Sequence, residues 1–180
     1  MLKDLLVPRL RLVVCGTAAS TVSAERGLYY AGPGNKFWPV LYEIGLTNRQ
    51  LRAEEYEQLL HFRIGLTDVA KGQSGSDLEI DFRLSNPQAL CKKMIEFMPE
   101  ILAFNGKKAA QVFLNRRNME YGPQIETISS TRLFVAPSTS GAANGSWNVD
   151  CWKELAGLVS ESIQSMDAAG NPKSSKQMEN

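Results

Sequence analysis

The sequence predicts an α/β fold, a three-layer sandwich in which helices flank a short, mainly parallel central sheet. Short apolar runs at 10–15, 101–104 and 133–136 have the uninterrupted, β-branched character of buried strands. They alternate along the chain with longer segments whose apolar residues recur at helical spacing. Alternation of this kind connects successive strands through helices, which favours parallel pairing and a covering layer on each face of the sheet.

Helical segments are indicated by apolar spacing and by signals at their ends. Asn86 followed by Pro87 is a typical helix start, and Pro99 ends the helix that Leu90 and Met94 continue. The expected helices are residues 37–44, 53–62, 87–98, 107–114 and 150–163. Between the second and third of them, a short segment leads into a polar stretch that is rich in glycine and serine.

The length of 180 residues suits one domain, which we expect to span residues 1–164. Residues 165–180 are polar and lysine-rich, and we expect them to form a disordered tail. No apolar run approaches the roughly 18 residues of a membrane-spanning helix, and Asp4 does not fit a signal peptide. Three scattered cysteines indicate reduced thiols, so the sequence predicts a cytoplasmic protein with no membrane partner.

The residue types present exclude many kinds of enzyme. The chain has one histidine, His61, and three separated cysteines, so no zinc or iron–sulfur ligand set forms at the usual spacings. A serine triad would need His61, which is better explained as an ordinary residue at a helix end. The sequence contains neither a Walker A pattern nor Gly-x-Gly-x-x-Gly after the first strand. We therefore expect neither a metal nor a cofactor.

Two loops at strand ends are the expected walls of a binding site. Gly16–Lys36 follows the first strand and Pro137–Trp147 follows the last, and ligands of open α/β sheets sit at the carboxyl ends of strands. The first loop contains Tyr29 and Tyr30, which either stack on a planar base or pack over the sheet. Residues 105–118 hold four basic side chains and no acidic one. Both a solvated helix face and contact with phosphates fit this stretch.

Six segments, in matching order and spacing, resemble one known family. They are Leu12–Ser20, Gly27–Trp38, Glu43–Thr47, Gly65–Asp68, Phe104–Lys107 and Pro137–Gly141. The resemblance is to the uracil-DNA glycosylase superfamily, and within it to the branch of mismatch-specific uracil/thymine glycosylases. In that branch the first segment is a strand followed by Gly-Ile-Asn-Pro-Gly, and the second is an aromatic loop that ends in Asn-Arg-Phe-Trp. The resemblance implies the three-layer fold of that superfamily.

The resemblance also implies an enzyme that flips a base out of DNA and cleaves its N-glycosidic bond without a cofactor. Tyr30 corresponds to the aromatic residue that stacks on the base. The backbone N–H groups of Tyr30 and Thr17 would contact the pyrimidine edge, with Ala18 beside them. Asn35 corresponds to an asparagine that we expect to brace the loop next to the base. The implied DNA contacts are Ser138, Thr139, Ser140, Gly141, Ala142, Asn144 and Lys107.

The chain departs from the family at the residue that normally orients the attacking water. Family members usually place Asn or Asp two residues after the strand-ending glycine, where this chain has Ala18. Three explanations stay open: the role has moved, the enzyme relies on stabilising the leaving group, or the chain binds without cutting. Asp68 is the first candidate for a relocated base, and bracing a turn explains it equally well. Thr17 and Ser23 complete the candidate catalytic residues.

The sequence therefore predicts a monofunctional DNA glycosylase of base excision repair, which excises uracil and related deaminated bases and leaves an abasic site. A lyase is not indicated, because the one lysine of the first loop, Lys36, sits at its far end. The expected partner is DNA that contains uracil or a mismatch, bound by a monomer in a bacterial-type cytosol. Two alternatives stay open, a non-catalytic reader of uracil or abasic DNA and a hydrolase of small nucleosides.

Overall fold

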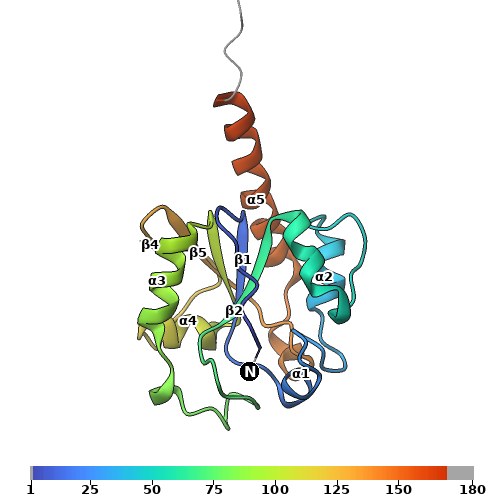
Figure 1. Cartoon of the computed structure of the whole chain (residues 1–180), viewed down its shortest axis with the longest axis vertical. Helices are drawn as coiled ribbons and strands as arrows, with labels where there is room; N and C mark the ends of the chain where they lie inside the picture. Colours follow the sequence, from blue (N-terminus) through green and yellow to red (C-terminus); the bar gives the residue numbers. More distant parts are fainter. Residues whose placement is uncertain (1, 170–180) are drawn as a thin grey trace, which may run out of the picture.

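A five-stranded sheet forms the centre of the molecule in the computed structural model, which describes residues 2–169 (Figure 1). Its strand order is β2-β1-β3-β5-β4. The strands are β1 Leu12–Gly16, β2 Ile64–Asp68, β3 Ile101–Asn105, β4 Gly122–Ile128 and β5 Thr131–Ala136. All neighbouring pairs are parallel except β4 with β5. The predicted class, an α/β sandwich with a mainly parallel sheet, is confirmed.

The edge strand β4 was not predicted. Only Gly122 and Ile128, at its two ends, are buried, and a bulge between Pro123 and Thr127 interrupts its pairing with β5. Polar residues alternate with single apolar ones, so the strand lacks the apolar run that marks β1, β3 and β5. An exposed edge strand gives little signal in the sequence, because its residues need not be apolar.

The helices lie close to their predicted positions, with three differences. They are α1 Thr21–Arg26, α2 Phe37–Glu43, α3 Pro87–Phe97, α4 Lys107–Leu114 and α5 Val149–Ala169, with the 3₁₀ helices η1 Ala53–Phe62, η2 Phe82–Leu84 and η3 Gly141–Ser146. The expected helix over 53–62 is therefore a 3₁₀ helix. The loop expected to be irregular contains α1, which begins where Ser20 Oγ accepts from Ser23 N and ends at Gly27 with φ +68°. The last helix runs past residue 164, and residues 170–180 of the expected tail lie outside the described part.

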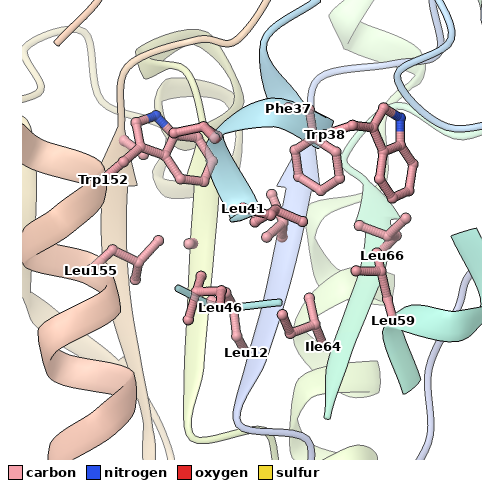
Figure 2. Packing of buried hydrophobic residues seen from close by; sticks show 14 of the residues in the cluster. Leu12, Phe37, Trp38, Leu41, Leu46, Leu59, Ile64, Leu66, Trp152 and Leu155 are labelled. Carbon is pink, nitrogen blue, oxygen red and sulfur yellow. The ribbon is translucent and has the colours of Figure 1, made fainter. Parts of the chain in front are cut away.

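The side chains of β1, β3 and β5 alternate between two cores, one on each face of the sheet. Leu12 and Val14 face a core that includes Phe37 and Trp38 of α2, Leu59 of η1 and Trp152 of α5 (Figure 2). Val13 and Cys15 face the other core, which α3 and α4 cover through Leu90, Met94, Ala109 and Ala110. The inner strands β1 and β3, and β5 apart from Arg132, are buried on both faces, which explains their continuous apolar runs.

Four parallel strands bring their carboxyl ends to one edge of the sheet. Gly16 pairs with Asp68 at the ends of β1 and β2, and Asn105 pairs with Ala136 at the ends of β3 and β5. This edge lies near α1 at the lower side of Figure 1. Among residues 2–169, no helix is long and apolar enough to cross a membrane, and no cluster of His, Cys, Asp or Glu could hold a metal ion.

Candidate active site

A cleft of about 770 Å³ opens at the carboxyl ends of the parallel strands. Its size falls in the range of about 300–1,000 Å³ that is usual for small-ligand sites. The loop after β1, the aromatic loop and the loop after β5 line it together with the strand ends Gly16, Asp68 and Asn105. The two loops expected to be walls therefore do enclose one cavity.

The two walls contact each other directly at the rim of this cleft. Lys36 N donates to Thr139 O at 2.8 Å, and Lys36 Nζ donates to Asn144 Oδ1. A Cβ at Gly141 would lie 3.4 Å from Gly34 O, so the close approach of the loops favours glycine there. These contacts hold the aromatic loop and the loop after β5 in one arrangement.

A reciprocal pair of hydrogen bonds fixes the loop after β5 to the sheet. Asn105 Nδ2 donates to Thr139 Oγ1 at 2.8 Å, and Thr139 N donates to Asn105 Oδ1 at 2.9 Å. Thr139 is fully buried, so its hydroxyl cannot contact a DNA phosphate as the resemblance implied. Its role is to anchor the loop. Asn105 was not among the predicted site residues, and its one signal in the sequence is its position as the last residue of a strand, directly before Gly106.

Tyr30 occupies the floor of the cleft in an uncommon backbone conformation, with φ +52°. Its ring stacks on Phe37 with 3.9 Å between centroids, and its hydroxyl is buried with no hydrogen-bond partner among the described residues. Burial and the nearby Asp68 raise the pKa of this hydroxyl well above its ordinary value, so it keeps its proton. Tyr29 is 2% exposed and packs in the core, and it also lines the cleft.

Asp68 ends β2 with its carboxyl group over Gly16. It is 6% exposed, and its Oδ1 lies 2.6 Å from where a Cβ on Gly16 would be. Its Oδ2 accepts from Lys71 Nζ at 3.1 Å. Burial raises the pKa of this carboxyl above its usual value, and Lys71 offsets part of the rise. Asp68 therefore lines the cleft as a buried carboxylate that one cation supports.

Unused backbone donors surround the same cavity. The N–H groups of Thr17, Ala18 and Tyr30 make no hydrogen bond within residues 2–169, and all three residues line the cleft. The carbonyl of Thr17 accepts from Ala70 N at 2.8 Å, which fixes this turn against the segment after β2. Oriented amide N–H groups of this kind suit a carbonyl oxygen or an anion.

Two other predicted site residues are engaged with the backbone of the aromatic loop. Ser23 is buried, and its Oγ accepts from Ala31 N at 3.1 Å and from Ser20 Oγ at 3.0 Å. Asn35 Oδ1 accepts from Phe37 N at 3.0 Å, at the start of α2. Both residues line the cleft, and their side chains also brace the loop. Among the predicted catalytic residues, Asp68 is the one with a carboxylate.

The loop after β5 presents small polar residues at the mouth of the cleft. Ser138 Oγ accepts from Ser140 N, and Ser140 Oγ accepts from Ala142 N at the start of η3. Ser140, Ala142 and Asn144 are exposed, and Ser138 and Gly141 are half-buried. On the neighbouring wall, Lys107 lies 4.5 Å from the ring centre of Tyr121 and 3.9 Å from Glu120.

Comparisons with known proteins identify the family and the fold. Residues 4–156 match the family model described as the Uracil DNA glycosylase superfamily. The chain belongs to the uracil DNA glycosylase superfamily. A solution NMR structure of a Methanosarcina acetivorans protein, named as a candidate uracil DNA glycosylase, has the same fold with a TM-score of 0.57. The two share 23% sequence identity, over 88% of this chain and 96% of that one.

Within this uracil DNA glycosylase fold, one wall of the cleft was not anticipated from the sequence. Gly75, Ser76, Asp77 and Glu79 line the cavity, as do the lysines of α4. Gly75 N donates to Ala19 O at 2.9 Å, which joins this segment to the turn after β1. The sequence of this polar, glycine-rich stretch does not predict that it lines the cleft. Its position depends on a hydrogen bond to a residue more than fifty positions earlier in the chain.

Proposed function

We propose that the protein is a monofunctional DNA glycosylase that removes uracil and related deaminated bases from DNA. It would act as a cytoplasmic monomer in base excision repair and leave an abasic site. Membership of the superfamily supports a DNA glycosylase role. One observation supports the proposal that uracil and related bases are removed. The Tyr30 ring, unused backbone donors and the carboxylate of Asp68 line the same cleft.

The base would be bound by stacking and by backbone donors. A uracil flipped into the cleft stacks on Tyr30, whose position Phe37 supports from behind. The N–H groups of Thr17, Ala18 and Tyr30 donate to the base oxygens as the glycosidic bond breaks. Negative charge collects on the departing base, and donors that are already oriented stabilise it without reorganisation.

Asp68 would orient the attacking water molecule, which the methyl side chain of Ala18 cannot do. When the N-glycosidic bond breaks, its electron pair leaves with the base nitrogen and the sugar becomes an oxocarbenium-like cation. The carboxylate of Asp68 stabilises that cation and orients a water molecule. The water oxygen bonds to the sugar carbon, and Asp68 accepts the released proton. A carboxyl group whose pKa is raised by burial is better suited to this step than an exposed one.

The contacts of Lys36 support a monofunctional reaction. A lyase needs an unprotonated lysine amine beside the sugar carbon. Lys36 Nζ instead donates to Asn144 Oδ1 and lies 5.4 Å from the centre of the Trp147 ring. The exposed residues Ser140, Ala142 and Asn144, with Lys107, would contact the DNA around the flipped nucleotide.

The test is release of uracil from a labelled duplex with one uracil opposite guanine, with a chelator present. Strand scission that appears only after alkali would support the proposal. Scission without alkali would contradict the monofunctional mechanism. Parallel duplexes with hypoxanthine or xanthine, the other common deamination products, define the range of bases. Asp68→Asn is expected to lower the excision rate by about 100-fold or more while DNA binding is retained.

A non-catalytic reader is the second candidate, and the methyl side chain of Ala18 is the observation that favours it. A reader would bind uracil-containing or abasic duplex more tightly than undamaged duplex and release no base. Gel-shift titrations across a range of salt concentrations, run beside the excision assay, separate the two. Binding that weakens steeply with salt and no base release from any of the three substrates would establish the reader.

A further inference from the structure

Lys71 lies directly behind the carboxyl group of Asp68, on the side away from the cleft. Its side chain is 22% exposed. Its Nζ donates to Asp68 Oδ2 at 3.1 Å, to Asp4 Oδ1 at 2.8 Å and to Tyr29 Oη at 2.8 Å. Leu2 O is a fourth acceptor, at 3.3 Å. Four acceptors surround an ammonium group that has three protons, so Lys71 is held in one position.

Asp4 is fixed in turn by partners from other elements. Thr67 Oγ1 donates to its Oδ1 at 2.8 Å, and Lys93 Nζ of α3 donates to its Oδ2 at 2.5 Å. The segment that carries Asp4 is joined to β2 through two hydrogen bonds between Leu5 and Leu66, at 2.9 and 3.0 Å. The result is a chain of alternating charges, Lys93–Asp4–Lys71–Asp68, that ends at the floor of the cleft.

This chain of charges constrains how Asp68 can act. Its Oδ2 is occupied by Lys71, so Oδ1, which lies against Gly16, is the oxygen left for the cavity. We propose that Lys71 is a positioning residue that orients the Asp68 carboxylate and keeps it charged during base removal. The inference rests on the proposed function, and it assigns a role to a residue that touches neither the base nor the sugar.

The groups around Asp68 determine what removing Lys71 would do. Asp68 is near two charged groups, Lys71 and Asp4. It is also near the thiol of Cys15 and the hydroxyls of Tyr29 and Tyr30. Burial raises the pKa of the Cys15 thiol and of both tyrosine hydroxyls, so these three groups stay neutral. Lys71 is thus the cation in contact with Asp68. Without it, burial and the charge of Asp4 act unopposed, and both raise the pKa of Asp68.

The experiment measures single-turnover excision of uracil as a function of pH, between about pH 5 and pH 9. Activity needs ionised Asp68, so the rate falls on the acid side as this carboxyl group takes up a proton. In Lys71→Met the acid limb is expected to move up by about one pH unit or more, which makes the rate about tenfold lower where the rates of both proteins fall with pH. The rate should recover toward that of the wild type at the alkaline end. Binding of an uncleavable duplex should change by less than about twofold.

Two variants provide matched controls for this shift. Lys93→Met removes the same charge from the other oxygen of Asp4 without touching Asp68, and its acid limb should stay where the wild-type limb lies. Lys71→Arg keeps the cation and should retain most of the wild-type profile. Where Lys71→Met does not fold, as judged by its thermal melt, Lys71→Gln replaces it, because the amide can still donate to Asp68 without a charge.

The outcomes separate this inference from the function on which it rests. An unmoved acid limb in Lys71→Met, or an equal loss of rate at every pH, overturns the positioning role and leaves the glycosylase proposal intact. Equal shifts in Lys71→Met and Lys93→Met also overturn it, because the effect would then be one of general charge. A wild-type protein that releases no base from any substrate refutes both proposals together.

Discussion

Gly16→Ala tests whether the position of the Asp68 carboxylate limits the reaction. The added Cβ would lie 2.6 Å from Asp68 Oδ1 and 3.4 Å from Tyr30 Oη. A carbon–oxygen contact is comfortable at about 3.3 Å, so the carboxylate must move by about 0.7 Å. Asp68 is not free to swing aside, because Lys71 holds its other oxygen. Displacements near 1 Å cost about 100-fold in rate, and we expect the excision rate to fall between about 10- and 100-fold.

The same substitution should leave the fold in place. Gly16 does not have a positive φ, so alanine is compatible with its strand conformation, and local overpacking costs about 1–3 kcal/mol. Single-turnover excision and urea denaturation measure the two effects separately. Gly157→Ala is the control, because a Cβ there meets nothing within 4 Å on the exposed side of α5. Excision by Gly16→Ala at the wild-type rate would refute the reasoning, since it would show that the reaction does not depend on where Asp68 lies.

Three further predictions concern neighbouring residues. Tyr30→Ala should weaken binding of uracil-containing DNA by about 1–3 kcal/mol, with undamaged duplex as the control; unchanged binding would assign Tyr30 to packing alone. Asn105→Ala leaves the buried N–H and hydroxyl of Thr139 without a partner and should lower the free energy of unfolding in urea by about 1–3 kcal/mol. A smaller change would argue against the anchor. Burial raises the pKa of Asp4, but hydrogen bonds from its two lysine partners outweigh this and bring it below 3.8. Ionised Asp4 therefore stabilises the fold above about pH 4, and this contribution is lost as the pH falls further. The free energy of unfolding in urea should thus differ between wild type and Asp4→Asn above about pH 4, and the difference should shrink below it.

Local signals in the sequence were enough to predict the strands β1, β3 and β5 and the helices α3 and α4. The Asn86–Pro87 start of α3 is confirmed, with Asn86 Oδ1 accepting from Ala89 N, and α4 spans the predicted residues Lys107–Leu114. These features depend on residues a few positions apart, and burial on both faces leaves a clear apolar pattern in the strands. β4 was missed because an edge strand needs no such pattern.

The candidate site was predictable in outline and not in its connections. Gly16 ends a predicted strand, and Tyr30 lies in a predicted loop. Asp68 was singled out through the family resemblance, and its strand β2 was not predicted as a strand. The burial of Thr139 could not be foreseen, because it depends on a partner 34 residues away in the chain. The contact between Asp4 and Lys71 joins residues 67 positions apart, and only the folded sheet brings them together.

The link between the two cleft walls has a consequence for how a damaged base would be selected. Lys36, Thr139 and Gly141 hold the walls against each other, and Asn105 ties them to the sheet. Because the walls are held together, the cleft can change its conformation little when DNA binds. The double helix must therefore deform to bring a nucleotide into it. Unpairing and unstacking a nucleotide costs a few kcal/mol in a sound duplex and less at a mismatch. For a glycosylase with such a rigid cleft, the lower cost of unpairing a damaged base would itself favour damaged sites. This selection would act before the protein contacts the edge of the base.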